Sequence, residues 1–523
     1  MLYFGYAKNK TTSKESKEVT NMPDTRLRKP PESLGINSCN ILEFLDRIEE
    51  HGVNMHSFIL ARHGCVAAEG YWAPYSADKP HRIYSSGKTV GALAIGLLIG
   101  EGRLSLDDRI IDLLPDKAQI EPHPYVDAMT VRDLLMMATP FKTDCYYYGM
   151  TDRVHDFLHQ APDYEPGTKF SYNTSATYTL NVITERLTGE RLIDYLRPRL
   201  FDPIGVSHSV KCLSMPDGYS HSGSSMIILQ RDFSLIVELV MRRGEWNGLQ
   251  LIPRSFMDEM TSPMIDNTPK ISPAAAPKLL HHGNGYGYQL WMLPGKDRFF
   301  FSGMGDQNGF CFADLDLTFC CMADNQGPNS SSLRKVIFDS LMECIVDRLT
   351  PGDLPLPENP AVYDALLARL SKLQYAVPRG SAESPLMSVL DRVVYSLEPC
   401  SMGITKLSFT FDGDRGVMRY ENAQGEKELP FGLCRWENIL FPQTGYPGSD
   451  YMPSDELYKC IAAGAFENNT LRIKVQSVGD FIGNIVMEFR FDGDDIAVSM
   501  RRGAQFFFDE YNGDAKGKHI KAH

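Results

Sequence analysis

The 523-residue sequence lacks several patterns by which enzyme classes are recognised. It has no Gly-x-Ser-x-Gly, which argues against the nucleophile elbow of an α/β-hydrolase. It has neither His-Glu-x-x-His nor Cys-x-x-Cys, although it contains 13 histidines and 11 cysteines, so no zinc protease or zinc-ribbon site is supported. We therefore expect no metal and no cofactor.

Long apolar runs and an excess of positive charge are also absent. The longest apolar run, residues 90–99, has about half the length of a membrane span and contains glycines. The net charge of −13 argues against nucleic acid or an anionic membrane as the main partner. The cysteines are odd in number and show no paired spacing, which favours reduced thiols. We expect a cytoplasmic protein with no membrane span.

Ser85 lies three residues before Lys88, where an apolar, small-residue segment predicts a buried helix. Residues at this spacing share one helical face. A serine hydroxyl needs an adjacent base, and a lysine is a base only when it is neutral, which burial promotes by lowering the lysine pKa. The helix start also directs the N–H of Ser85 toward a developing oxyanion. The alternative is an N-cap serine followed by a solvated lysine.

A second segment that can contribute to the site spans residues 165–183. Pro166 and Gly167 predict a turn, after which an apolar helix runs to about residue 188. Tyr172 lies at the mouth of this helix. Taken alone, it is better explained as a half-buried tyrosine with a satisfied hydroxyl.

Together these segments resemble the serine beta-lactamase-related family over about residues 30–350. That family includes class C beta-lactamases, penicillin-binding-protein-like D-alanyl-D-alanine carboxypeptidases, carboxylesterases, 6-aminohexanoate-dimer hydrolase and some acyltransferases. The resemblance implies an α+β, beta-lactamase/transpeptidase-like fold, with an antiparallel sheet flanked by helices plus a helical subdomain. In order, the matching segments are Ser85-x-x-Lys88 (SxxK), EGRLSLDDRIIDLLP, MTVRDLLMMAT, EPGTKFSYNTSATYTLNVITERLTG, GYGYQLW and FSGMGDQNGF.

The resemblance also implies roles for individual residues. Ser85 would be the acylated nucleophile and Lys88 its proton acceptor, while Tyr172 would carry protons to the leaving group and to the deacylating water. The family usually has Tyr-x-Asn at the second motif, whereas this chain has Tyr-Asn-Thr. Either Thr174 replaces the usual asparagine or Asn173 turns into the site.

The third motif departs further from the family, which places Lys-Thr-Gly or a His-x-Gly variant on a strand beside the site. The corresponding stretch here is FSGMGDQ, with Met304 where the cation would be. Its loss removes the charge partner of a substrate carboxylate, so we expect a neutral ester or amide substrate. Gly303 and Gly305 allow close approach of the substrate, and a backbone N–H near Gln307 can complete an oxyanion hole with that of Ser85. The alternative is a glycine-rich hairpin without a catalytic part.

Three histidines, His81, His221 and His282, are candidates for the neighbourhood of the site. His221 lies in a polar loop, residues 218–225, that can line a substrate pocket. We expect it to be a solvent-exposed loop histidine. No histidine is predicted to be catalytic, because the lysine and the tyrosine already supply the proton transfers.

Composition along the chain predicts two domains. A hairpin at 58–61 and 65–68 and a helix at 333–349 are expected in the first domain, and a helix at 361–373 follows a proline-rich stretch. Period-two alternation between Asp-Gly turns predicts antiparallel strands at 406–411, 471–475, 485–491 and 496–500. The expected boundaries are a flexible leader at 1–30, a serine hydrolase domain at 31–349, a linker at 350–360 and a C-terminal, mainly β domain at 361–523.

The sequence thus predicts a serine hydrolase that forms an acyl-enzyme on Ser85 and cleaves a small ester, amide or peptide. An acyltransferase that uses the same acyl-enzyme is one alternative, and a non-catalytic, penicillin-binding-type ligand-binding protein is another. The C-terminal domain can shape the mouth of the site, mediate contacts in a homo-oligomer, bind a ligand, or serve as a structural partner.

Overall fold

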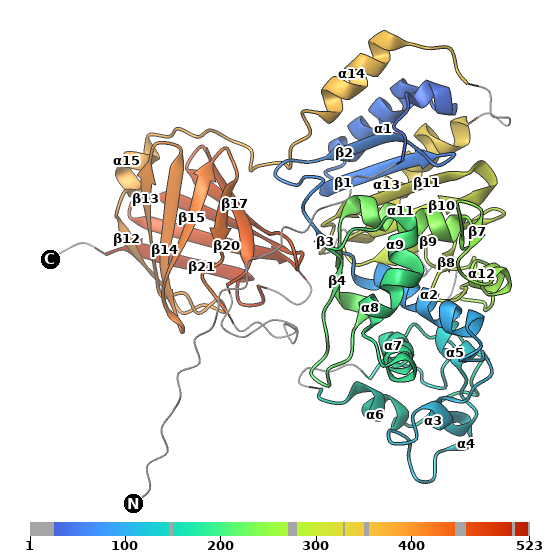
Figure 1. Ribbon diagram of the computed structural model, residues 1–523. Coiled ribbons are helices and arrows are strands. Elements are labelled where there is room, and N and C mark those ends of the chain that lie inside the picture. The colour runs from blue at the N-terminus through green and yellow to red at the C-terminus, as the bar shows by residue number, and fades with distance from the viewer. Residues whose placement is uncertain are drawn as a thin grey trace, which may run out of the picture.

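In the computed structural model, a mixed α/β domain is followed along the chain by a β-barrel (Figure 1). The structure describes residues 26–145, 150–269, 280–327, 330–349, 355–444, 457–504 and 508–520. Most of the expected leader 1–30 and the first half of the expected linker 350–360 lie outside these residues. Within the described ranges, no helix has the length and apolar character needed to cross a bilayer.

The first domain is built on an antiparallel sheet with the strand order β2-β1-β11-β10-β9-β8. The hairpin expected at 58–68 is confirmed as β1 (Met55–Arg62) and β2 (Cys65–Tyr71). Every residue of β1 is buried, as in strands covered on both faces. The other strands of this sheet are β8 (Trp291–Met292), β9 (Arg298–Gly303), β10 (Gln307–Phe312) and β11 (Leu317–Ala323).

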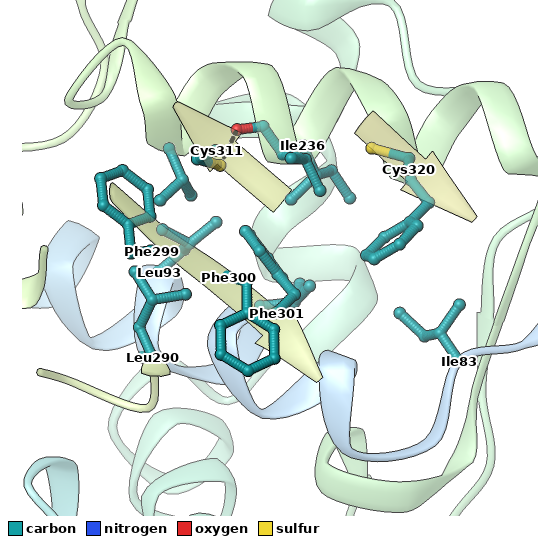
Figure 2. Packing of buried hydrophobic residues seen from close by; sticks show 14 of the residues in the cluster. Ile83, Leu93, Ile236, Leu290, Phe299, Phe300, Phe301, Cys311 and Cys320 are labelled. Carbon is teal, nitrogen blue, oxygen red and sulfur yellow. Dashed lines mark hydrogen bonds between the residues drawn. The ribbon is translucent and has the colours of Figure 1, made fainter. Parts of the chain in front are cut away.

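Alternation along the strands produces two apolar faces, each covered by helices. On one face, Phe310 of β10 lies 5.7 Å, between ring centroids, from Phe338 of α13 (Ser330–Cys344), which overlaps the helix expected at 333–349. Helix α1 (Ser38–Glu50) packs beside α13. On the other face, α11 (Gln230–Met241) contacts β10 and β11. Figure 2 shows Ile236 of α11 and Leu93 of α2 (Gly87–Gly100) packed among the phenylalanines of β9.

A helical subdomain is inserted between β2 and β8. Its long helix α7 (Thr174–Thr188) packs on α2, begins at the capping residue Asn173 and ends at Gly189, whose φ of 72° is left-handed. The shorter helices are α3 (Ile110–Leu113), α4 (Pro124–Asp127), α5 (Val131–Leu135), α6 (Arg153–Leu158), α8 (Leu192–Leu196), α9 (Asp202–Ile204), α10 (Ser222–Ser225) and α12 (Arg254–Met260). Two small sheets complete it, β3 (His81–Arg82) with β5 (Met226–Ile228) and β4 (Lys211–Cys212), and β6 (Glu245–Trp246) with β7 (Leu249–Gln250).

The second domain is a barrel, whose sheet runs β15-β14-β13-β12-β21-β20-β19-β18-β17-β16 in the described residues. It closes through a parallel pairing of β15 with β17, at Gly432 and Ala463. All four strands predicted from period-two alternation are confirmed, within β13, β18, β19 and β20. The elements are α15 (Leu386–Leu390), β12 (Val394–Leu397), β13 (Lys406–Asp412), β14 (Arg415–Asn422), β15 (Gly425–Leu433), β16 (Glu437–Leu440), β17 (Lys459–Glu467), β18 (Thr470–Ser477), β19 (Asn484–Asp492), β20 (Asp495–Gly503) and β21 (Gly513–His519).

Helix α14 (Pro360–Leu370) packs on the first domain, although the expected boundary at 361 assigns it to the second. Leu366 is fully buried in the core of the first domain, and Arg369 bonds Glu49 of α1. Tyr375 lies in the same core. The apolar face of this helix, rather than the proline-rich sequence before it, decides which domain the helix joins.

Candidate active site

Ser85 lies in a tight turn, η2 (Tyr84–Ser86), between β3 and helix α2. Tyr84 has the left-handed φ of 47°, which is uncommon for a residue with a side chain. A Cβ added at Gly87 would lie 2.1 Å from the carbonyl oxygen of Ser222, so only glycine allows α10 to lie against the start of α2. The residue at the N-cap of α2 is Ser86, and it makes no side-chain capping bond. Ser85 is therefore not a helix cap.

Lys88 is hydrogen-bonded to Ser85. Its Nζ lies 2.9 Å from Oγ of Ser85 and 2.9 Å from the carbonyl oxygen of Gly223, and the residue is 1% exposed. Burial lowers its pKa from the usual range to about 7, an effect opposed by the charge of Asp144 and reinforced by that of Arg153. The alternative of a solvated surface lysine is wrong, and this lysine is poised to act as a base near neutral pH.

Tyr172 lies on the other side of the same pair. The Nζ of Lys88 is 5.0 Å from the centroid of its ring, and the Ser85 hydroxyl bonds the Tyr172 hydroxyl. Burial raises the pKa of Tyr172 above its usual value, and the bond from Ser85 only partly offsets this. Tyr172 therefore keeps its proton at neutral pH and can donate it, which leaves the role of base to Lys88.

Aromatic side chains pack against the ring of Tyr172. Its ring stacks on Trp291 of β8, with centroids 5.3 Å apart and planes at 24°, and Trp291 in turn packs edge-on against Tyr286. These two residues belong to the motif GYGYQLW. The sequence analysis assigned them no role, because a single sequence does not show which aromatic side chains meet.

Asn173 and Thr174 lie at the start of α7. The Asn173 side chain accepts a hydrogen bond from the N–H of Ala176 and donates one to the carbonyl oxygen of Thr143 at 3.4 Å, and the residue is fully buried. The backbone N–H of Thr174 donates to Asp144. The structure thus gives Asn173 a helix-capping role at this position.

Charged side chains lie behind Ser85, Lys88 and Tyr172. Asp144 accepts hydrogen bonds from the Ser175 hydroxyl and from Arg153, which is 1% exposed. Nε2 of His221 lies 3.4 Å from Arg153. His221 is 2% exposed, so the expectation of an exposed loop histidine is wrong. Its pKa is held well below the usual range by burial and by the positive charges of Arg153 and Lys88, so it is neutral.

The other two candidate histidines have different surroundings. His81 is buried in β3, and its Nε2 lies 2.8 Å from Nδ1 of His56. His282 is half-buried and lies edge-on to Trp291 at 6.4 Å. Within the described part of the chain, no cluster of three or more His, Cys, Asp or Glu side chains is arranged to hold a metal ion.

The third motif forms the turn between β9 and β10, and it lies against the Ser85 turn. A Cβ at Gly303 would come 2.3 Å from the carbonyl oxygen of Ile83. The Ser86 hydroxyl donates to the carbonyl oxygen of Gln307, whose side chain donates to the carbonyl oxygen of Met304 at 3.0 Å. This glycine-rich hairpin therefore packs directly on the Ser85 turn, and Gly303 is required for the close approach.

The positive charge near this turn is already paired. Arg334, on α13, bonds the fully buried Asp306 and lies 3.4 Å from Nδ1 of His281, whose Nε2 lies 2.7 Å from the Ser302 hydroxyl. The sequence analysis missed Arg334, because it stands 28 residues beyond Asp306 and outside every motif.

Comparison with known proteins identifies the first domain more closely. Residues 44–210 match the sequence model of the family described as Beta-lactamase. Among curated relatives, N-acetylmuramyl-L-alanine amidase of Bacillus subtilis (strain 168) is 28% identical over 131 residues, which are 22% of this chain and 30% of the relative. The chain therefore spans about a third of the length of the curated relatives that it matches.

Solved structures with a similar fold include two penicillin-binding protein homologues. The one from Caulobacter crescentus is 17% identical, with a TM-score of 0.47, over 61% of this chain and 99% of its own. The octameric one from Pyrococcus abyssi is 14% identical, with a TM-score of 0.44, over 91% of this chain and 99% of its own.

Proposed function

We propose that this chain, whose first domain belongs to the beta-lactamase family and has its α+β fold, is a serine hydrolase that works through an acyl-enzyme on Ser85. One observation carries the proposal. The Nζ of Lys88 lies 2.9 Å from the Ser85 Oγ, on a side chain whose burial lowers its pKa to about 7. A neutral amine at that distance can take the hydroxyl proton as the oxygen attacks.

The site supports each later step of the reaction. As Oγ of Ser85 bonds the substrate carbonyl carbon, Lys88 receives the proton, and the carbonyl oxygen becomes an oxyanion. The backbone N–H of Ser85, together with one from the turn at Gly303–Gln307, is suited to stabilise that charge. Tyr172 then passes a proton to the leaving group as its bond to the carbon breaks. Water then attacks the acyl-serine, and Tyr172 takes a proton from it. Lys88 returns its proton to Oγ of Ser85, which releases the acid and restores Ser85.

We propose a small ester, amide or peptide as the substrate. The family resemblance implies that Met304 replaces a cation, and Arg334 is bonded to Asp306, so among the described residues little unpaired positive charge faces this side of the site. These features support a substrate that is neutral at this point. Acyl transfer to an alcohol or amine remains the second use of the same acyl-enzyme. The proposed compartment is the cytoplasm, which the eleven free cysteines support.

The test is covalent labelling of Ser85. The protein is incubated with a fluorophosphonate probe, and intact mass and peptide mapping are measured for wild type, Ser85→Ala, Lys88→Ala and Tyr172→Phe. We expect one adduct on Ser85, none in Ser85→Ala, and slow labelling of Lys88→Ala. Ser408→Ala, in the barrel, is the matched control and should label normally. An unlabelled wild type would favour the non-catalytic, ligand-binding alternative.

A further inference from the structure

The barrel contacts the turn that carries Ser85 through residues 478–483, which join β18 to β19. The backbone N–H of Ile482 donates a hydrogen bond of 3.0 Å to the Tyr84 hydroxyl. Both residues are buried, Ile482 at 3% and Tyr84 at 6% exposure. Because Tyr84 immediately precedes Ser85, a bond from the second domain ends one residue away from the nucleophile.

Tyr84 is held in an unfavourable backbone conformation. Its φ of 47° lies in the left-handed region, where a residue with a side chain persists only if its surroundings enforce it. The Arg82 guanidinium lies 4.8 Å from the Tyr84 ring centroid and 5.1 Å from that of Phe481, in the barrel segment. The Tyr84 side chain is therefore held by its hydroxyl and through its ring.

The same barrel segment touches the other half of the site. A Cβ added at Gly305 would lie 2.4 Å from Cδ1 of Ile482, so the Ile482 side chain packs directly on the turn that follows Met304. Ile482 thus contacts Tyr84 through its N–H and the third motif through its side chain. Ile482 of the barrel therefore joins the two sides of the oxyanion hole that Ser85 and this turn would form.

Both ends of the barrel segment are attached to the first domain. Asp324, which follows β11 and is fully buried, accepts hydrogen bonds from the Gln476 side chain at 2.7 Å and from the Asn484 side chain at 3.2 Å. These residues stand on either side of residues 478–483. The segment is therefore fastened at both ends as well as at Tyr84.

We propose that Ile482 and Tyr84 form a clamp by which the barrel positions Ser85 relative to the turn at Gly303–Gln307. The proposal rests on the proposed function and deepens it. Tyr84 and Ile482 are positioning residues, since they act through Ser85 and the turn rather than on the substrate. Misplacing a reacting group by about 1 Å can cost about 100-fold in rate, so a contact this close to the nucleophile has a large effect.

The test compares Tyr84→Phe and Ile482→Ala with a matched control, Tyr420→Phe. Tyr420 is a buried barrel tyrosine whose hydroxyl lies 2.8 Å from that of Tyr511, so the control also removes one buried hydroxyl. The rate of fluorophosphonate labelling, kcat and KM for p-nitrophenyl acetate, and Tm are measured on the full chain. We expect both clamp variants to label and turn over about tenfold more slowly, with KM within about twofold, and the control to keep its rates.

Two results would overturn the clamp. One is labelling of Tyr84→Phe or Ile482→Ala within about twofold of wild type, and the other is an equal loss of rate in Tyr420→Phe, which would indicate a general effect of removing a buried hydroxyl. Should one clamp variant fail to fold, the other decides. A wild type that takes no label on Ser85 would instead reject the proposed function and, with it, any catalytic effect of the clamp.

Discussion

Each domain contributes a lysine that lies over a tyrosine ring, and only one of these lysines has a serine hydroxyl beside it. Lys88 is buried, whereas Lys474 is half-buried. Lys88 lies 5.0 Å from the Tyr172 ring centroid, and Lys474 of β18 lies 4.4 Å from that of Tyr375. Burial lowers both pKa values, to about 7 for Lys88 and about 8 for Lys474. Burial alone therefore produces a lysine that can be neutral, without making it a catalyst.

The difference lies in the partner atoms. Lys88 has Oγ of Ser85 at 2.9 Å, whereas Lys474 has the amide oxygen of Asn54 at 3.5 Å. The nearby carboxylate of Asp324 raises the pKa of Lys474 and so partly opposes its burial. The comparison shows that a lysine with a lowered pKa indicates a catalytic base only when a hydroxyl that it can deprotonate lies within hydrogen-bond distance.

The largest expected effect separates the two lysines directly. Lys88→Met should lower the rate of Ser85 labelling by about 1000-fold, because it removes the general base. Lys474→Met, the matched control, should leave that rate within about twofold, because its amine lies beside Asn54 and not beside a serine hydroxyl, and Tm checks that the variant is folded. Labelling kinetics measure the rate of Ser85 modification, and thermal unfolding measures Tm. An equal loss of labelling in both variants would contradict the distinction.

The two tyrosines should differ in the same way. Tyr172→Phe keeps the ring that stacks on Trp291 but removes the proton donor, so we expect turnover to fall by about 100-fold and the acyl-enzyme to accumulate. Tyr375→Phe removes the hydroxyl that donates to Gln476 and should leave turnover within about twofold. Intact mass during turnover of p-nitrophenyl acetate detects the accumulated acyl group. Normal turnover by Tyr172→Phe would refute its role.

The pH profile tests which lysine the rate depends on. Lys88 is a base only when neutral, so the labelling rate should rise about tenfold per pH unit below its pKa and level off above about 7. Lys474→Met should keep the same midpoint. A midpoint that moves in this variant, or a rate that falls as pH rises from 6 to 8, would contradict the assignment of Lys88 as base.

The smallest expected effect concerns substrate choice at the third motif. Because Met304 provides no cation for the carboxylate of a beta-lactam, we expect slow or absent turnover of nitrocefin by wild type. Met304→Lys should raise the nitrocefin rate by about a few-fold, because the new lysine can form one solvent-accessible ion pair with the substrate carboxylate, and such pairs contribute little energy. The rate for p-nitrophenyl acetate should change little. Rapid hydrolysis of nitrocefin by wild type would contradict the preference for a neutral substrate.

Sequence alone determined those features that depend on local spacing. The three-residue spacing from the turn into the helix brings Ser85 and Lys88 together wherever that helix lies. Period-two alternation identifies barrel strands because each strand buries one face. Tyr172 was found through its motif. Its contact with Ser85 and its stacking on Trp291 came only from the fold.

Tertiary structure decided the features that join distant parts of the chain. Arg334 meets Asp306 across 28 residues, Ile482 meets Tyr84 across 398, and packing buries the loop histidine His221. Covalent geometry sets which neighbours along a helix or strand share a face. The pairing of distant side chains depends instead on how helices, sheet and barrel pack together, and a single sequence does not encode that arrangement in any local pattern.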